Sequence, residues 1–546
     1  MYSLRGVTLY AWQDECLARW FENGCKGVAG VATGAGKTLL ALAAIERLAK
    51  TRDKTSLRVR IVVPKVFLAH QWRADIVRFL GVSRGDIGLY CGAVKESPEK
   101  PFVIYVLNTA RFCVSRHILR DTDAGRSVLL ICDECHHFGS AVNARVFDFL
   151  TRVPRERYFA LGLSATPECD GFDTAVAPAL GGVIFRYGIS EAAADSVTSG
   201  CAVFSVAVDF SPEERADYDS YTDRIAITRA RLVKIVPRLN GERGAAFIQG
   251  VRQLQGRADK TGELARQLAL LYIRRKEILH LARARADCAV ELVKELITDG
   301  RIIVFAERIE TVDFVYGELD ALYPGKICRY HSNMDAAEKA RALERYRDGE
   351  RPVIVCCRAL DEGLNVPDTD VGIILSAGTG ARQRIQRIGR VLRRGGDREI
   401  KNIYYIYVSG TSESPDALPE PDAPPGGRWP AEARGGAVQI RARGLRYDAK
   451  DGRFYNPEYE ALSERVLQTL RRQGADARQA RYAERLLARG ALRSDYLRPP
   501  ERCRALIESA ADGERDYYRC MLLLARARAG PDTRAPDSCI SGAPGV

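Results

Sequence analysis

Long apolar segments are absent from this sequence of 546 residues. No apolar run approaches the roughly 18–20 residues that a helix needs to cross a bilayer, which argues against an integral membrane protein. Residues 1–20 contain Asp14 and Glu15 and lack the pattern of a secretory signal peptide. We therefore expect the protein to be cytoplasmic.

Cysteine spacings typical of disulfide frameworks and zinc sites are also lacking. The 15 cysteines lie in apolar surroundings, as Cys356 and Cys357 do, which indicates reduced core residues. The segment 132–137, with the sequence CDECHH, resembles half of a zinc site, but no second Cys/His pair follows it at a suitable spacing. We therefore expect no zinc site in this segment.

Composition and charge describe a chain of several globular domains. A length of 546 residues exceeds what one hydrophobic core supports, and 46% hydrophobic with 28% charged residues is typical of globular proteins. The net charge of +13 favours a polyanion such as nucleic acid as partner. High arginine content from a GC-rich genome would give the same charge, so composition alone leaves both explanations open.

A glycine-rich loop follows the apolar run that ends at Val31. Its residues are Thr33, Gly34, Ala35, Gly36, Lys37 and Thr38, and an alanine- and leucine-rich helical pattern follows. Glycines let backbone N–H groups turn inward around phosphates, while Lys37 would contact the phosphates and the Thr38 hydroxyl would hold Mg²⁺. Val31 occupies the position of the first glycine of the general motif, so the loop by itself could be a chance turn.

A pair of carboxylates follows a second apolar run, residues 128–132, which is typical of a buried parallel strand. In doubly wound sheets, ligands bind at the carboxyl ends of the strands, so Asp133 and Glu134 would face the glycine-rich loop. Asp133 could hold Mg²⁺ through water, and Glu134 could polarise the attacking water. A solvated turn with two acids is the alternative, and the upstream loop argues against it.

Together these motifs resemble those of superfamily 2 helicases and translocases of the DExH type, with residues 133–136 as a DECH box. The resemblance covers roughly residues 5–410 and is closest to XPB-type repair helicases and type III restriction motor subunits. It implies that Gln13, within the segment 9–13, reads the adenine edge of ATP. Tyr10 and Ala11 replace the Arg-Pro pair usual before the aromatic residue of that segment.

The resemblance also assigns roles to other residues of the first domain. It implies that His136, Ser164 and Thr166 couple the DECH box to the nucleic-acid side. Backbone contacts with the bound strand are implied for two further segments, the one that contains Pro64, Gln71 and Trp72, and the one that contains Thr109.

A second α/β unit is indicated by the apolar runs at 301–307 and 353–357. The run at 353–357 leads into residues 358–367, which resemble motif V and contain Gly363, with Asn365 where many relatives have Asp. Residues 386–393, with the sequence QRIGRVLR, match motif VI. The resemblance implies that Arg390 and Arg393 are arginine fingers, Gln386 contacts the nucleotide and Arg387 supports the contact between domains. A solvated basic helix is the alternative for this segment.

We predict an α/β protein with two tandem RecA-like doubly wound parallel-sheet domains. The expected units are a first ATP-binding domain (1–210), a helical insertion (211–286), a second RecA-like domain (287–410), a Pro- and Ser-rich linker (411–427), a mostly helical accessory domain (428–529) and a disordered tail (530–546). A hairpin is expected within 438–455. The roles of the insertion and the accessory domain stay open at this point.

The resemblance implies an ATP-dependent helicase or translocase that uses ATP and Mg²⁺ and acts on nucleic acid, with DNA favoured over RNA. Two alternatives share the same ATP-binding residues. One is an ATP-gated clamp or remodelling subunit of a restriction, defence or repair complex, and the other is an RNA helicase. Protein partners could bind through the C-terminal region, and no membrane partner is expected.

Overall fold

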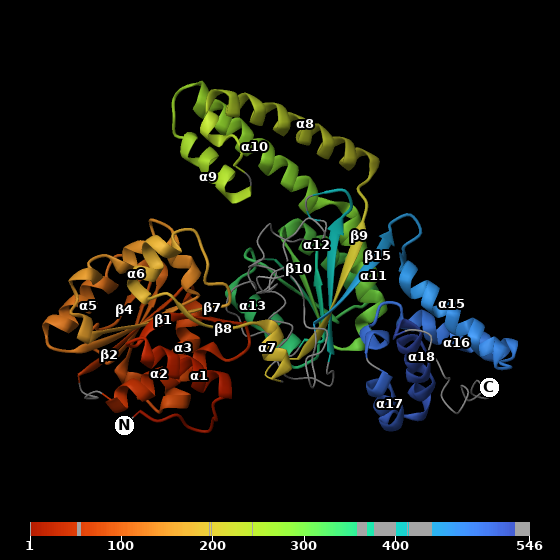
Figure 1. The fold of residues 1–546 in the computed structure, drawn as a ribbon, viewed down its shortest axis with the longest axis horizontal. Helices are drawn as coiled ribbons and strands as arrows, with labels where there is room; N and C mark the ends of the chain where they lie inside the picture. The colour runs from red at the N-terminus through yellow and green to blue at the C-terminus, as the bar shows by residue number, and fades with distance from the viewer. Residues whose placement is uncertain are drawn as a thin grey trace.

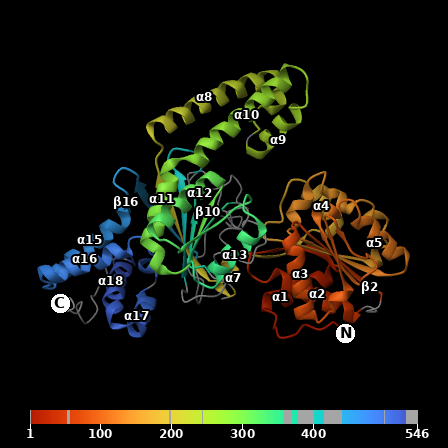
Figure 2. The same cartoon turned by 180° about the vertical axis from the view of Figure 1, so that it is seen from behind.

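The computed structural model describes residues 2–51, 56–195, 197, 199–242, 244–357, 369–375, 400–411, 413, 439–498 and 500–529. Two α/β domains lie side by side, a helical unit projects from the second of them, and a group of C-terminal helices packs on its far side (Figure 1). Figure 2 shows the same arrangement from behind. No helix in these ranges has the length and apolar character needed to cross a membrane.

The first sheet carries the glycine-rich loop and the DECH box. Its strands follow the order β4 (Val94–Lys95), β3 (Ile87–Cys91), β5 (Phe102–Val106), β2 (Leu57–Val63), β6 (Ser127–Asp133), β7 (Tyr158–Ser164), β1 (Lys26–Val31) and β8 (Val183–Tyr187). All neighbouring strands are parallel except β3 and β4. Strand β7 therefore separates β1, which ends at the loop, from β6, which ends at the DECH box.

Helices cover both faces of this sheet, which explains why its central strands are continuously apolar. One face packs against α1 (Ala11–Glu22), α2 (Lys37–Thr51) and α3 (Val66–Leu80). The other face packs against α4 (Leu107–Ala110), α5 (Val114–Asp123) and α6 (Ala177–Leu180). Alternate residues of one strand enter the two cores, as Ile131 and Leu130 of β6 do.

The second sheet is also predominantly parallel. Its strands follow the order β11 (Ile327–Tyr330), β12 (Val353–Cys357), β10 (Ile302–Ala306), β13 (Val371–Ile374), β14 (Ile400–Val408), β9 (Gly200–Val208), β15 (Gln439–Asp448) and β16 (Arg453–Tyr455). Among these neighbours only β15 and β16 are antiparallel, and they form the hairpin expected within 438–455. Helices α11 (Arg283–Leu296), α12 (Ile309–Leu322) and α13 (Ala336–Arg347) pack beside this sheet.

The first domain ends earlier than expected, because strand β9 belongs to the second sheet. Residues 200–208 were assigned to the first domain, but β9 pairs with β14 on one side and β15 on the other, in the second sheet. The chain enters the second domain through the short helix α7 (Ile189–Ala194), before the helical insertion rather than after it. The pairing partners of β9 lie about 200 residues further along the chain, so local sequence carries no signal of this placement.

The insertion forms a helical unit with a core of its own. Helices α8 (Pro212–Ile235) and α10 (Lys260–Leu281) run along each other, and α9 (Gly244–Leu254) packs on α10. Ser211 begins α8 with a capping box that includes Glu214, and Asp259 caps α10. This unit stands away from both sheets in Figure 1.

The C-terminal helices complete the second domain. They are α15 (Pro457–Arg472), α16 (Ala477–Gly490), α17 (Pro500–Ser509) and α18 (Asp512–Ala529). Apolar residues of α15, α16 and α18 belong to the same buried cluster as β9, β10 and β14. A buried ion pair between Arg493 and Asp299, with a shortest distance of 2.8 Å, ties this group to the end of α11. Most of the expected linker and the expected tail lie outside the described residues.

Candidate nucleotide-binding site

The glycine-rich loop turns between the end of β1 and the beginning of α2. Gly34 and Gly36 adopt φ values of 88° and 105°, a left-handed region that other residues rarely occupy. Lys37 is the first residue of the 15-residue helix α2 and Thr38 is the second, so the amino terminus of this helix faces the loop. Such a terminus presents backbone N–H groups to an anion.

The lysine of the loop lies beside the DECH box. Lys37 Nζ is 3.8 Å from Glu134 Oε1 and donates a hydrogen bond to the Val31 carbonyl at 3.3 Å. Both charged side chains are mostly buried. The loop and the acidic pair, about a hundred residues apart in the sequence, therefore meet at one edge of the first sheet.

Asp133 is held by two donors at the end of β6. The Trp72 indole Nε1 donates to Asp133 Oδ2 at 2.9 Å, and the Glu134 backbone N–H donates to Oδ1 at 3.0 Å. Burial and the neighbouring Glu134 carboxylate raise the pKa of Asp133 to about 6. The Trp72 hydrogen bond and Lys37 oppose this increase in the pKa.

Trp72 therefore has a different place from the one expected. The resemblance implies that its side chain contacts the nucleic acid, but Trp72 is 1% exposed and faces Asp133 inside the first domain. Leu68, Trp72 and Ile76 follow one another at helical spacing and all lie on the buried face of α3. This spacing could have identified Trp72 as a core residue, but nothing in the sequence indicated the carboxylate that it contacts.

Glu134 begins a short chain of polar contacts toward β7. Its backbone adopts φ 48°, which is uncommon for a residue with a side chain. Glu134 Oε2 lies 3.5 Å from His136 Nδ1, which in turn lies 2.9 Å from Ser164 Oγ. The Thr166 backbone N–H donates to the same Ser164 oxygen at 3.1 Å. The residues expected to couple the two sides of the domain are thus in contact.

Gln13 lies against the glycine-rich loop. Its Nε2 donates to the Gly36 carbonyl at 3.1 Å, while its Oε1 accepts from the Tyr10 backbone N–H at 2.9 Å. The neighbouring Trp12 ring stacks on Tyr187 with ring centroids 4.6 Å apart, which fixes α1 against β8. Nothing in the sequence indicated this stacking.

The other residues expected at the nucleic acid follow the neighbouring strands β2 and β5 in the sequence. Pro64 follows β2, Gln71 lies in α3, and Thr109 lies in α4 after β5. Pro64, Gln71 and Thr109 are half-buried. Thr109 Oγ1 accepts a hydrogen bond from the Gly92 backbone N–H at 3.2 Å.

The expected site residues of the second domain lie outside the described residues. These are Gly363, Gln386, Arg387, Arg390 and Arg393. The strand β12 that leads toward Gly363 is described and pairs in parallel with β10 and β11.

The groups of the first domain fit a nucleoside triphosphate with its metal ion. Lys37 and the N–H groups of the loop are donors, and Thr38 and Asp133 offer oxygen atoms, which Mg²⁺ prefers. Thr33 supplies a buried hydroxyl that has no hydrogen-bond partner among the described residues. A triphosphate in the loop would meet this hydroxyl and the amino terminus of α2 together.

Comparisons with known proteins agree with this geometry. The family of type III restriction enzyme res subunits matches residues 6–169, and the helicase conserved C-terminal domain matches residues 286–395. The two matches lie in the two α/β domains, and the chain resembles helicases of superfamily 2. The second match includes the arginine-rich segment 386–393.

Two named relatives are similar to this chain over both domains. The DNA 3'-5' translocase XPB2 of Sulfurisphaera tokodaii is 27% identical over 416 residues, which cover 74% of this chain and 83% of the relative. The DNA 3'-5' helicase XPB of Kineococcus radiotolerans is 25% identical over 415 residues, which cover 75% and 61% of the two chains. The match thus spans less than two thirds of the second relative.

A solved structure shares the fold of this chain. The crystal structure of the DUF1998 helicase MrfA bound to DNA superposes with a TM-score of 0.50 and 17% identity, over 74% of this chain and 47% of that one. The two parallel sheets with helices on their faces are therefore the tandem RecA-like domains of this superfamily.

Proposed function

We propose that this chain is an ATP-dependent DNA helicase or translocase. The observation that carries the proposal is the 3.8 Å approach of Lys37 to Glu134 at the edge where β1, β7 and β6 end. This arrangement brings together a phosphate-binding lysine and a carboxylate that can polarise water, and nucleotide hydrolysis needs both groups.

The roles of the first-domain residues follow from their positions. Lys37 and the loop N–H groups would hold the phosphates, and Glu134 would orient the attacking water. Thr38 and Asp133 would hold Mg²⁺, which when bound neutralises charge on the phosphate oxygens. Gln13, held against the loop at Gly36, is our candidate for contact with the base.

Arginines from the second domain would complete the site. We assign Arg390 and Arg393 as donors to the γ-phosphate, with Gln386, Arg387 and Gly363 in support, because segment 386–393 falls within the matched helicase C-terminal domain. Arginine fingers contribute about 10³–10⁵-fold to the rate of such reactions. Hydrolysis would then require the two domains to close on the nucleotide, and each cycle of closing and opening would move one domain along the bound strand.

DNA is the proposed polyanion. The positive net charge favours a nucleic acid, and the two relatives described above are named a DNA translocase and a DNA helicase. Pro64 and Gln71, which follow β2, and Thr109, which follows β5, are the candidates for contact with the phosphate backbone. His136, Ser164 and Thr166 would link these contacts to Glu134.

The test is the ATPase rate of the full chain without nucleic acid and with single-stranded DNA, duplex DNA or RNA. We expect DNA to stimulate the rate more than RNA does. Replacement of Lys37 by Ala should reduce the stimulated rate by about 10²-fold or more, as expected when a charge-stabilising donor is removed. Lys50→Ala is the matched control, because Lys50 lies on the same helix and forms an exposed pair with Glu46.

Three results would contradict parts of this proposal. Normal turnover by the Lys37→Ala variant would exclude the assigned nucleotide site. Stimulation by RNA alone would assign the enzyme to RNA. DNA-stimulated turnover without displacement of a strand or movement along DNA would favour an ATP-gated clamp.

A further inference from the structure

A cavity of about 400 Å³ lies in the first domain, away from the glycine-rich loop. It opens beside Lys26, the first residue of β1, and Tyr158, the first residue of β7. The loop and Ser164 lie at the opposite ends of the same two parallel strands, so the cavity is separate from the proposed nucleotide site. Its remaining walls come from residues 144–155 and 174–179.

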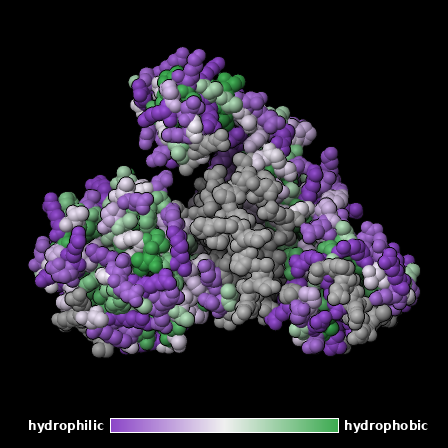
Figure 3. All heavy atoms as spheres, in the orientation of Figure 1, coloured by the Kyte–Doolittle hydropathy of each residue, from purple (hydrophilic) through white to green (hydrophobic). Residues whose placement is uncertain are grey.

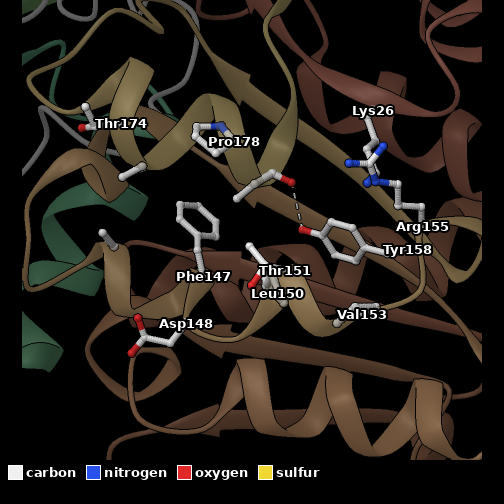
Figure 4. Close-up of a pocket in the computed structure, with 13 residues that line it drawn as sticks. Lys26, Phe147, Asp148, Leu150, Thr151, Val153, Arg155, Tyr158, Thr174 and Pro178 are labelled. Atoms are coloured by element: carbon white, nitrogen blue, oxygen red, sulfur yellow. Dashed lines mark hydrogen bonds between the residues drawn. The ribbon is translucent and has the colours of Figure 1, made fainter.

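The floor of the cavity is apolar. Leu150, Val153 and Tyr158 are buried, and the half-buried Phe147 ring lies across the cavity from Tyr158 (Figure 4). The Tyr158 hydroxyl already donates to the Ala179 carbonyl at 3.1 Å. The aromatic ring of Tyr158, rather than its hydroxyl proton, is therefore what this wall offers to a ligand.

Two cations stand together at one end of this cavity. Lys26 Nζ lies 4.7 Å from the centre of the Tyr158 ring, and the Arg155 guanidinium lies beside Lys26 (Figure 4). Burial, together with repulsion from Arg155, lowers the pKa of Lys26 below its ordinary value. Within the described parts of the chain, neither cation forms an ion pair. Asp148 lies at the other side of the cavity and pairs with Arg145 at 3.9 Å.

The loop that builds this wall has an unusual backbone. Phe149, between the lining residues Asp148 and Leu150, adopts φ 66°, and its side chain is 48% exposed. A left-handed conformation is costly for an aromatic residue and persists where the surrounding structure imposes it. Here it lets Phe147 and Leu150 both line the cavity while Phe149 points outward.

We propose that this cavity binds a small aromatic anion, whose charged group lies between Lys26 and Arg155. The aromatic body would pack on Tyr158, Leu150 and Phe147, and the anion would relieve the repulsion between the two cations. The volume falls in the range of small-molecule sites and is too small for a folded segment of another protein. The ligand would contact the first residues of the two strands that end at the glycine-rich loop and at Ser164.

The experiment uses the fluorescent aromatic anion anilinonaphthalene sulfonate, titrated into the full chain with the nucleotide site saturated by a non-hydrolysable ATP analogue. Loss of a charged hydrogen-bond donor should weaken binding by about tenfold in Lys26→Gln and in Arg155→Gln. Thr174→Phe, at the rim of the cavity, should weaken it by blocking entry. Arg485→Gln is the matched control, because Arg485 is an exposed cation over the ring of Tyr482 in a distant helix.

Competition with the probe shows whether the cavity recognises the charge of a ligand or only buries its apolar ring. Benzoate should displace the probe, whereas benzyl alcohol, which has a similar shape and no charge, should not. Circular dichroism of each variant checks that its fold is intact. Equal probe affinity in the wild type, Lys26→Gln and Arg155→Gln would overturn the proposal, and so would equal competition by benzoate and benzyl alcohol. Both outcomes are independent of whether the chain hydrolyses ATP.

Discussion

At the scale of single residues, Trp72 shows how a buried carboxylate is oriented. An isolated buried carboxylate is costly, and Asp133 is 7% exposed beside a second acid. The indole N–H of Trp72 offsets part of this cost and fixes the direction of Oδ2. Because Trp72 lies next to Gln71 in α3, the helix proposed to contact nucleic acid is tied directly to the proposed metal ligand.

Replacement of Trp72 by Phe keeps an aromatic ring but removes the N–H donor. We expect the Mg²⁺ concentration for half-maximal ATPase activity to increase by about 10-fold or more, because donors to metal ligands typically have effects of this size. Binding of Mn²⁺ to the nucleotide-loaded chain, followed by electron paramagnetic resonance, should weaken in parallel.

Trp20→Phe is the control for this variant. The Trp20 indole is also buried and donates at 2.9 Å, but to the Ala160 carbonyl, away from the acidic pair. This variant should lose about 1 kcal/mol of stability and keep its Mg²⁺ dependence. An unchanged Mg²⁺ dependence in Trp72→Phe would show that the indole N–H has no influence on the metal site.

At the scale of elements, the helical insertion has the properties of a separately packed unit. Leu232 of α8, Phe247 of α9 and Leu268 of α10 are buried together in a cluster that includes no residue of either sheet. The space-filling view shows apolar surface on this unit among hydrophilic side chains (Figure 3). Exposed apolar residues on α8 and α10, Ile227, Leu270 and Ile273, contribute to its surface. The base of the unit joins the second domain, where Tyr218 of α8 and Leu279 of α10 belong to the buried cluster of the second sheet. The outer part, which contains its own cluster, is therefore expected to open separately from the sheets.

Leu268→Ala should destabilise this insertion by about 2–5 kcal/mol, because it leaves a cavity in a small core. Amide hydrogen exchange should increase across residues 212–281 while the strands of both sheets keep their protection. Leu270→Ala, on the same helix but at a site that is 54% exposed, should change stability by less than about 0.5 kcal/mol. Equal loss of protection in the sheets would show that the insertion unfolds only together with them.

At the scale of the whole molecule, the two sheets are joined through a short apolar connection. A single buried cluster contains Tyr187 at the end of β8, Ala192 of α7 and Cys201 of β9, with residues of both sheets. The domain closure proposed above would change the angle between the domains at this connection. The net charge of +13 acts at the same scale, because it attracts a polyanion over distances longer than any single contact.

Affinity for duplex DNA should fall linearly with salt concentration on logarithmic axes, since phosphate contacts release counterions. With about six such contacts, the affinity should drop on the order of 10³-fold between 50 and 200 mM salt. Fluorescence anisotropy with labelled DNA measures this slope. A salt-independent affinity would contradict tracking along the phosphate backbone.

The sequence alone determined the features whose physics is local. Two motifs specify their conformation within about ten residues: the glycine-rich loop before a helix, and the two acids after an apolar strand. Lys37, Asp133 and Glu134 could therefore be placed at one sheet edge from the sequence. The apolar runs at 128–132, 301–307 and 353–357 likewise predicted buried strands. The tandem RecA-like arrangement and the motifs at 358–367 and 386–393 came from the resemblance to superfamily 2 helicases, and the roles of these motifs remain predictions.

Only the tertiary structure decided which distant segments meet. Strand β9 belongs to the second sheet because hydrogen bonds to β14 and β15 complete it there, and both partners lie far along the chain. The C-terminal helices share the core of that sheet for the same reason. Trp72 has the residue type and spacing of an ordinary core residue. Its hydrogen bond to Asp133 forms because the packing of α3 brings the indole N–H of Trp72 to the Asp133 carboxylate. Contacts between distant segments depend on the sum of the packing, which local sequence does not encode.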